Sequence, residues 1–246
     1  DIRYYKGHLN PNNVVLTQDT DAVCIFVNDT ADAAVIDAMV DNGVKLLALR
    51  CAGFNNVDLK AAKGKYIARM DGDDICLPER FAAEYETLET EKTISIVSTD
   101  MGYFDQTGIW GKISHPEYPK KKDFLYGSPF CHAPCMVRKE AYDAVAGYTE
   151  KKSILRVEDY HLWIKMYEAG YRGKNIPKQL YLMRDDRAAY KRRKLRYRIN
   201  EAYVKGIAVR KLGLPISGCL YTMRPILVGI LPEKVYDYFH KRKLES

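Results

Sequence analysis

The sequence lacks any hydrophobic run long enough to cross a membrane. Its longest candidate, residues 216–231, is interrupted by Arg224 and contains Pro225, whereas a spanning helix needs about 20 consecutive apolar residues. The chain also begins at Asp1 without the basic and then apolar segments of a secretory signal. We therefore expect neither a transmembrane helix nor secretion.

Cysteines are few and none has the spacing of a zinc site. The six are scattered, and the only close pair is Cys131 and Cys135. This pattern favours free thiols in a reducing compartment over disulfides or a structural metal. We therefore expect a cytoplasmic protein.

The positive charge is concentrated at the carboxyl end. The net charge is +7, but residues 187–246 hold fifteen Lys and Arg against four acidic residues, interleaved with apolar ones. A basic amphipathic helical tail of this kind binds anionic membrane surfaces. Nucleic-acid binding and a merely solvated helix face are the alternatives. We favour the inner face of a membrane and no nucleic acid, because nucleic acid would not need the apolar stripe.

The first 70 residues alternate between strand and helix patterns. Compact apolar runs predict strands, the amphipathic or capped segments between them predict helices, and the βαβαβ order predicts a mostly parallel sheet. The strands are expected at residues 21–27, 45–49 and 65–70, and the helices at about 30–42 and 57–62.

Three carboxylates follow the third strand directly. Asp71, Asp73 and Asp74 lie within four residues, with Gly72 between them. Ligand sites in open α/β sheets lie at the carboxyl ends of strands. Mn²⁺ or Mg²⁺ held by one or two carboxylates and completed by substrate phosphates would offset the clustered charge. The alternative is an Asp-rich turn or helix cap.

Four blocks of sequence extend this observation. Residues 64–81 resemble the acidic-motif region of family 2 glycosyltransferases, which have the GT-A fold. Blocks similar to that family's acceptor-side strand, catalytic acidic helix and final core strand follow in family order, at residues 128–139, 157–163 and 175–184. The resemblance implies an α/β, GT-A-like (Rossmann-like) sheet with flanking helices, followed by the helical basic tail.

The resemblance also implies roles for individual residues. Asp71 and Asp73 would hold the metal and through it the donor diphosphate, with Asp74 as a supporting charge. Asp159 would be the general base that activates the acceptor hydroxyl for inverting attack, and Glu158 would orient it. The alternative for this acidic pair is simple helix capping.

Two further residues are weaker candidates for the site. His132 lies in the acceptor-side block and is expected to contact acceptor or diphosphate. Arg184 is expected to meet diphosphate near the start of the tail. A surface or capping residue is the alternative for His132.

The amino-terminal part departs from the family. The strands expected to bind the nucleotide base and ribose are absent, and residues 1–62 resemble a D-2-hydroxyacid dehydrogenase of the D-lactate type, most specifically at residues 49–58. We therefore suspect a chimeric chain. The expected domains are a catalytic domain, residues 1–186, with a dehydrogenase-like segment to residue 62 and a glycosyltransferase core from 63, and the tail, residues 187–246.

The sequence thus predicts an inverting glycosyltransferase of surface polysaccharide synthesis. It would use a nucleotide-diphosphate sugar, with a UDP-sugar favoured, and a glycan or lipid-linked acceptor. The alternatives are an inactive chimera without a nucleotide-base site and a dehydrogenase fragment. A dehydrogenase is disfavoured because no G-x-G-x-x-G follows a strand.

Overall fold

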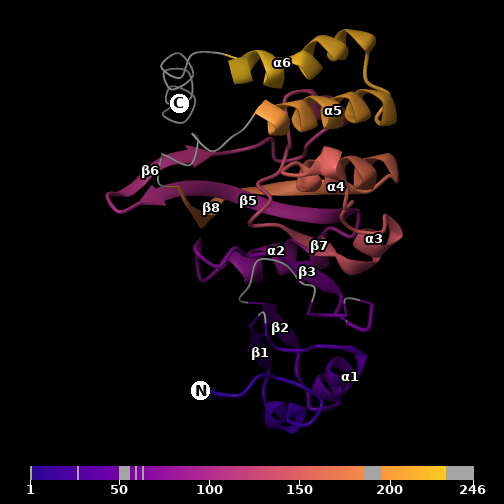
Figure 1. Ribbon diagram of the computed structural model, residues 1–246. Coiled ribbons are helices and arrows are strands. Elements are labelled where there is room, and N and C mark those ends of the chain that lie inside the picture. Colours follow the sequence, from indigo (N-terminus) through magenta and orange to yellow (C-terminus); the bar gives the residue numbers. More distant parts are fainter. Residues whose placement is uncertain are drawn as a thin grey trace. The chain divides into compact units, whose positions relative to one another are not determined.

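The computed structural model describes residues 2–26, 28–49, 56–58, 60–62, 64–185 and 195–230. It forms two compact units, Asp1–Lys65 and Tyr66–Ser246 (Figure 1). We describe each unit by itself. The domain boundaries expected from the sequence stay predictions.

Unit 1 contains the predicted βαβ motif. After a short 3-10 helix, η1 (Val14–Thr17), strands β1 (Ala22–Ile25) and β2 (Leu46–Leu49) pair in parallel and are connected by α1 (Ala33–Asp41). Asp32 caps this helix by accepting a hydrogen bond from the Val35 N–H at 3.0 Å. The buried core of the unit is apolar and consists of Ile25, Ala31, Val35, Ile36, Met39 and Val57.

The predicted alternation fails after β2. The expected helix at residues 57–62 is wrong for the residues described there, which form a single turn closed by the Ala62 N–H and the Asp58 carbonyl at 3.1 Å. The third predicted strand, β3 (Tyr66–Ala68), belongs to another sheet, in unit 2. The sequence pattern identified the strands but not which sheet each one joins.

The sheet of unit 2 is mixed. Its strands are β3, β4 (Ile75–Cys76), β5 (Ile94–Asp105), β6 (Gly108–Ile113), β7 (Met136–Arg138) and β8 (Arg172–Arg184), in the order β3-β7-β5-β8-β4 with β6 paired to β5. Among these pairings only β5–β8 is parallel. The α/β class is confirmed, but the sheet is not mostly parallel. The short connection at residues 106–107 imposes antiparallel pairing on β5 and β6. The other antiparallel pairs, β3–β7, β5–β7 and β4–β8, join strands that are far apart in the sequence.

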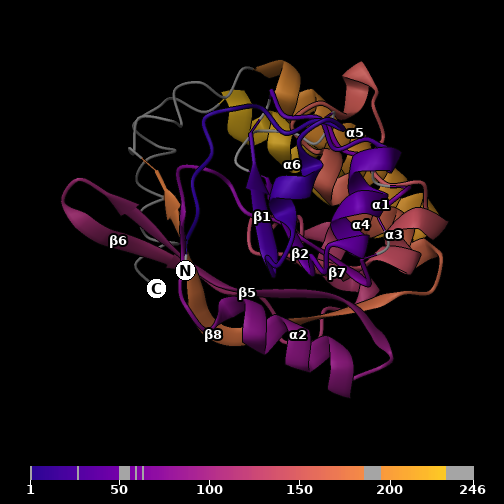
Figure 2. The same ribbon diagram turned by 90° about the horizontal axis from the view of Figure 1, so that it is seen from below.

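Helices cover both faces of this sheet. Helix α2 (Arg80–Thr90) packs on one face, and α4 (Glu158–Glu168) and α5 (Leu195–Lys211) lie over the other, with α6 (Cys219–Ile230) against α5 (Figures 1 and 2). The remaining elements of unit 2 are short: α3 (Lys139–Ala144), η2 (Lys121–Leu125), η3 (Lys152–Ile154) and η5 (Ile216–Gly218).

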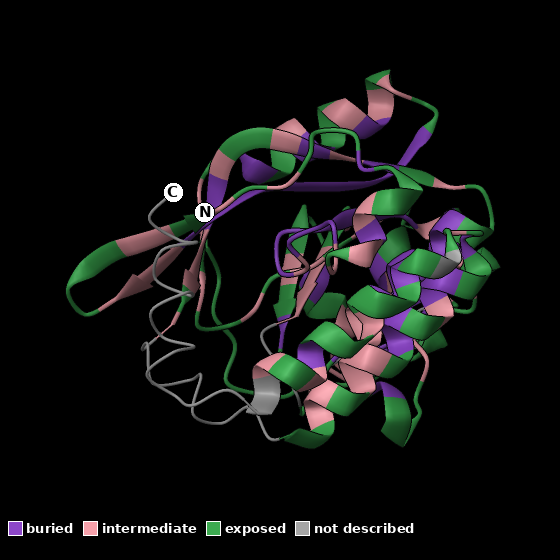
Figure 3. Cartoon of the chain, turned by 90° about the horizontal axis from the view of Figure 1, so that it is seen from above, coloured by how far each residue is buried: buried purple, intermediate pink, exposed green. Residues whose placement is uncertain are grey.

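Apolar spacing marks the buried face of α4 better than that of α2. In α4 the regularly spaced apolar residues, including Trp163, are buried. In α2 Leu88 is buried but Phe81 and Tyr85 are exposed, and the side chains of Arg80 and Glu84 are fully buried. In Figure 3 the buried residues lie along β5 and on the inward faces of the helices. A pattern of apolar residues cannot identify a face that buries an ion pair.

The tail is helical where the structure describes it. Helices α5 and α6 lie within it, whereas the most basic run, residues 190–194, and residues 231–246 are outside the described residues. No helix within the described ranges is long and apolar enough to span a membrane.

Candidate active site

The acidic segment, residues 71–74, forms the loop between β3 and β4. The Asp74 N–H donates to the Asp71 carbonyl at 3.3 Å, so the segment turns back on itself. Asp71 and Asp74 are partly buried, and Asp73 is exposed. Apart from its two chain neighbours, no described residue lies within 4 Å of a Cβ added at Gly72. Internal packing therefore does not require glycine here.

Both carboxylate oxygens of Asp74 are engaged within the chain. Oδ2 accepts a hydrogen bond from the Tyr181 hydroxyl, and Oδ1 accepts one from the Arg184 backbone N–H, each at 2.8 Å. Burial raises the pKa of Asp74 above its usual range, and the charges of Asp71 and Asp73 add to this rise. Asp74 is thus held in place by β8.

Asp71 and Asp73 keep more of their coordinating capacity. Asp71 Oδ1 accepts a hydrogen bond from Arg69 Nη2 at 2.8 Å, and the Asp73 carboxylate has no hydrogen bond or ion pair among the described residues. Arg184 lies next to them: its Nε donates to the Asp73 carbonyl at 3.2 Å, and its guanidinium lies 4.8 Å from the ring centroid of Phe104.

His132 lies beside the same segment and accepts hydrogen bonds through Nε2. The donors are Arg69 Nη1 and the Tyr148 hydroxyl, the latter at 3.0 Å. Burial, and then the charge of Arg69, hold the pKa of His132 well below its usual value. We infer a neutral ring with its proton on Nδ1. This atom is buried without a partner in the described part of the chain, so the predicted contact of His132 with a ligand stays a prediction.

Glu158 and Asp159 occupy the first turn of α4, as predicted. Burial raises the pKa of Asp159 to about 6, with a smaller contribution from the charge of Glu158, while backbone N–H donors and Arg69 oppose the rise. A helix N-terminus favours the ionised form of a carboxyl, but burial outweighs that effect at Asp159. Glu158 acts on Asp159 through its charge, and its Oε2 is buried without a partner among the described residues.

Arg69 connects these groups, although it was not among the site residues predicted from the sequence. Its guanidinium contacts Asp71 and His132, and its charge lowers the pKa of Asp159. The acidic segment, the acceptor-side block and the start of α4 therefore lie around one cation. The signal was present, because Arg69 is part of the block that carries the family resemblance. Tyr148 and Tyr181 were missed as well. Tyr181 lies in another block of the resemblance, residues 175–184, whereas Tyr148 lies outside the four blocks.

The arrangement fits a divalent cation bound by few protein ligands. No group of three or more His, Cys, Asp or Glu side chains able to hold a metal occurs in the described ranges. The Asp73 carboxylate is exposed and has no partner among the described residues, and together with Asp71 it offers the oxygen donors that Mg²⁺ and Mn²⁺ prefer. Such ions take one or two carboxylates and complete their shell with phosphates and water.

Comparison with known families divides the chain. Residues 50–145 match the profile of glycosyl transferase family 2, and residues 1–75 match that of the D-isomer specific 2-hydroxyacid dehydrogenase catalytic domain. The two matches overlap at residues 50–75.

Relatives of known name agree with this division. EpsE of Bacillus subtilis (strain 168), whose name assigns it to the glycosyltransferases, is 36% identical over 195 residues, which are 79% of this chain and 70% of that protein. The amylovoran biosynthesis glycosyltransferase AmsE of Erwinia amylovora is 27% identical over 76% of this chain and 71% of its own length. The 2-hydroxyacid dehydrogenase homolog 1 of Schizosaccharomyces pombe is 53% identical over 62 residues, 25% of this chain and only 19% of that protein.

A solved structure supports the fold. The crystal structure of S. aureus TarS 1-349 covers 89% of this chain and 66% of its own, with 15% sequence identity and a TM-score of 0.50. This likeness concerns the fold alone, and it agrees with the GT-A-like architecture predicted from the sequence.

Proposed function

Because the chain belongs to family 2 of the glycosyltransferases, we propose that it transfers a sugar from a nucleotide-diphosphate donor to an acceptor hydroxyl. A UDP-sugar is the donor we favour. The acceptor would be a glycan or a lipid-linked glycan in polysaccharide synthesis, a proposal supported by the amylovoran biosynthesis enzyme among its relatives.

One observation carries the proposal. Arg69 bridges Asp71 and His132 and acts electrostatically on Asp159. The groups proposed for the donor side and the group proposed as base are thus neighbours within unit 2, although 88 residues separate Asp71 from Asp159 in the sequence. A transfer reaction needs this proximity, because both reactants must be held in attack geometry.

Asp159 would act as the general base. Its carboxylate would take the proton of the acceptor hydroxyl while the acceptor oxygen forms a bond to the anomeric carbon. The bond from that carbon to the diphosphate would break on the opposite side, with its electron pair leaving on the diphosphate, and the configuration would invert. A pKa of about 6 suits this role, because the group is mostly ionised at pH 7 yet still basic.

Asp71 and Asp73 would hold Mn²⁺ or Mg²⁺. When bound, the cation would offset the negative charge of the diphosphate. Asp74 would support these two residues from the side of β8, and Arg184 would stand at the edge of the diphosphate site.

The amino-terminal match favours a second candidate. Residues 1–75 match a dehydrogenase domain where the family's nucleotide-binding strands are expected. Such a chain could bind metal and diphosphate without turnover. A dehydrogenase activity is not supported, since the match covers only 19% of the dehydrogenase relative.

Calorimetric titration separates these candidates. We expect UDP to bind in the presence of Mn²⁺, and binding to be lost in Asp73→Ala. GDP and free diphosphate test whether the base is recognised: equal affinity for all three would favour the second candidate. If the wild type transfers sugar and Asp159→Asn does not, although it still binds UDP, the glycosyltransferase function is supported. If none of the three ligands gave a binding signal, both candidate functions would be excluded.

We also propose that the tail binds an anionic membrane at its cytoplasmic face. Helix α6 exposes Leu220, Met223 and Leu227 at helical spacing, with exposed fractions of 78%, 50% and 62%. Arg224 is exposed among them. An apolar helix face that also carries a cation suits acyl chains and anionic lipid head groups.

A further inference from the structure

Tyr181 of β8 makes two hydrogen bonds to the acidic segment. Its hydroxyl accepts a hydrogen bond from the Asp71 N–H at 3.0 Å and donates one to Asp74 Oδ2 at 2.8 Å. The residue itself has no exposed surface. One phenol oxygen therefore fixes both ends of a four-residue loop.

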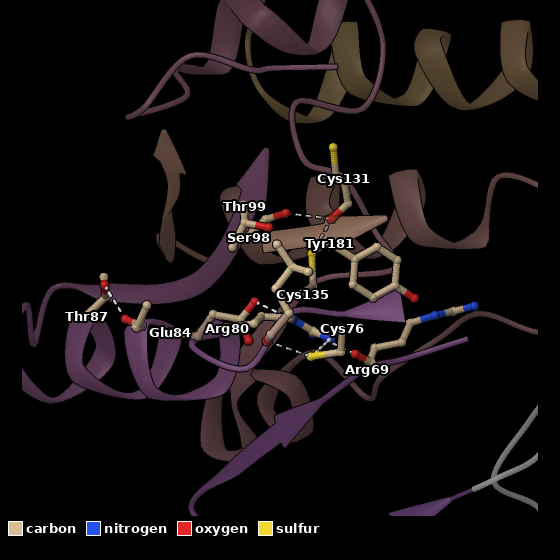
Figure 4. A network of polar contacts seen from close by, with 12 residues as sticks. Arg69, Cys76, Arg80, Glu84, Thr87, Ser98, Thr99, Cys131, Cys135 and Tyr181 are labelled. Atoms are coloured by element: carbon tan, nitrogen blue, oxygen red, sulfur yellow. Dashed lines mark hydrogen bonds and ion pairs between the residues drawn. The ribbon is translucent and has the colours of Figure 1, made fainter. Parts of the chain in front are cut away.

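The ring of Tyr181 packs against a buried cation, the guanidinium of Arg80. The Arg80 guanidinium lies 5.1 Å from the ring centroid, donates to the Arg69 carbonyl at 2.6 Å and pairs with Glu84 at 3.0 Å. Figure 4 shows Arg80 between Glu84 and Arg69, with Tyr181 beside it. The anchor is thus continuous from α2 through Tyr181 to the acidic segment.

The hydrogen bonds divide the three aspartates into two kinds. Both carboxylate oxygens of Asp74 accept hydrogen bonds from β8, one from the Tyr181 hydroxyl and one from the Arg184 N–H. The Asp73 carboxylate has no partner in the part of the chain that the structure describes. Hydrogen bonds from the buried Tyr181 hydroxyl and the exposed Arg184 N–H fix the orientation of the Asp74 carboxylate toward β8. The Asp73 carboxylate is not fixed in this way by the described residues, so it can turn its lone pairs toward a cation.

We propose that Tyr181 and Asp74 are positioning residues that set the backbone of the acidic segment, so that Asp71 and Asp73 alone present carboxylates to the cation and diphosphate. This inference rests on the proposed function, whose cation and diphosphate it concerns. Asp74 is then an anchor rather than a ligand.

The chain contains a matched control for Tyr181. Tyr167 of α4 is equally buried, and its hydroxyl accepts a hydrogen bond from the Gly173 N–H at 3.3 Å and donates one to the Pro119 carbonyl at 3.0 Å. Tyr167→Phe therefore also removes one accepted and one donated hydrogen bond, but at a position that we do not assign to the site.

The test measures UDP binding as a function of Mn²⁺ concentration, well below the melting temperature of every variant. In Tyr181→Phe the Mn²⁺ concentration for half-maximal binding should rise about tenfold, the usual order for losing buried hydrogen bonds to a charged group. It should stay at the wild-type value in Tyr167→Phe. An unchanged Mn²⁺ requirement in Tyr181→Phe, or an equal rise in both variants, would overturn the proposal.

A second pair of variants separates anchor from ligand. Asp74→Asn keeps an acceptor for the Arg184 N–H, so Mn²⁺-dependent binding should weaken by less than about tenfold, whereas Asp73→Asn should abolish it. Equal loss in the two would make Asp74 a ligand and refute our assignment.

Hydrogen exchange gives a readout without metal. The Asp71 amide should exchange faster in Tyr181→Phe than in the wild type or Tyr167→Phe, because its acceptor is gone. If the wild type bound no UDP with Mn²⁺, the proposed function would fail, and this exchange rate would still decide whether the anchor exists.

Discussion

The Arg80 guanidinium and the Glu84 carboxylate lie 3.0 Å apart on successive turns of α2, and neither side chain is exposed. Burial raises the pKa of Glu84 to about 7 despite the neighbouring cation. Its second oxygen, Oε2, is buried without a partner among the described residues. The pair is connected to the chain just before the acidic segment, because Arg80 donates a hydrogen bond to the Arg69 carbonyl at 2.6 Å.

This pair predicts that unit 2 loses stability as the pH rises. The folded pKa of Glu84 is above its ordinary value of 4.5, so the folded state binds the proton more tightly than the unfolded state does. The contribution is fully present below pH 4.5 and is lost as the pH rises to about 7, and it amounts to about 3 kcal/mol. Urea unfolding followed by tryptophan fluorescence measures it, since Trp110 and Trp163 both lie in unit 2.

Glu84→Gln is the control for that prediction. Glutamine keeps an acceptor for Arg80 and cannot ionise, so the difference in unfolding free energy between wild type and variant should change with pH between 4.5 and 7. A constant difference across this range would show that Glu84 titrates normally.

The rate of transfer should rise with pH through an apparent pKa of about 6. The proposed base, Asp159, must be ionised, and burial raises the pKa of its carboxyl to about 6. Initial rates at saturating donor, measured as a function of pH, give this rising limb of the pH–rate profile. Asp159→Asn should lower the rate by about 10²–10⁴-fold and abolish the limb, and a limb that persists in this variant belongs to another group.

Arg69→Met should move that limb to higher pH. The charge of Arg69 lowers the pKa of Asp159, so its removal lets burial dominate further. UDP binding should also weaken, because Asp71 loses its 2.8 Å ion pair. Arg172→Met removes a cation that lies over Tyr167 and should leave the limb at about 6. Identical profiles for all three proteins would mean that Arg69 does not act on the base.

The exposed face of α6 should determine membrane binding. Replacing Leu220, Met223 and Leu227 with serine should abolish flotation with anionic liposomes, because burying each side chain contributes about 1.5–3 kcal/mol. Ile109→Ser on β6 is the control, since this side chain is 59% exposed elsewhere in unit 2. Flotation of the triple variant at the wild-type level would exclude α6 as the contact.

The sequence predicted the local elements of this chain better than their assembly. The helix that begins at Glu158 and the strand before Asp71 follow from apolar spacing and flanking residues. The direction of strand pairing does not follow from such patterns. It depends on which distant segments meet, as β5 and β8 do across roughly 70 residues of intervening chain.

The candidate site shows the same limit. Asp71, Asp73 and Asp74 were predicted from their clustering after a strand and from the family resemblance, and Glu158 and Asp159 from the resemblance. Arg69 and Tyr181 lie in blocks that carry the family resemblance, but their contacts with His132 and with Asp71 and Asp74 join segments far apart in the sequence. Tyr148 lies outside these blocks, and its contact with His132 has no local pattern either. The low pKa of His132 likewise depends on burial, which a single sequence does not display.

The hydrogen bonds from Tyr181 and Arg184 to Asp74 close chain separations of 107 and 110 residues. Closing loops of this length is slow and costs entropy before any contact is gained. The acidic segment therefore reaches its final geometry only after β8 has docked beside β5. During synthesis, the region before residue 172 would leave the ribosome with its carboxylates still unconstrained, and binding competence would arise in one late step.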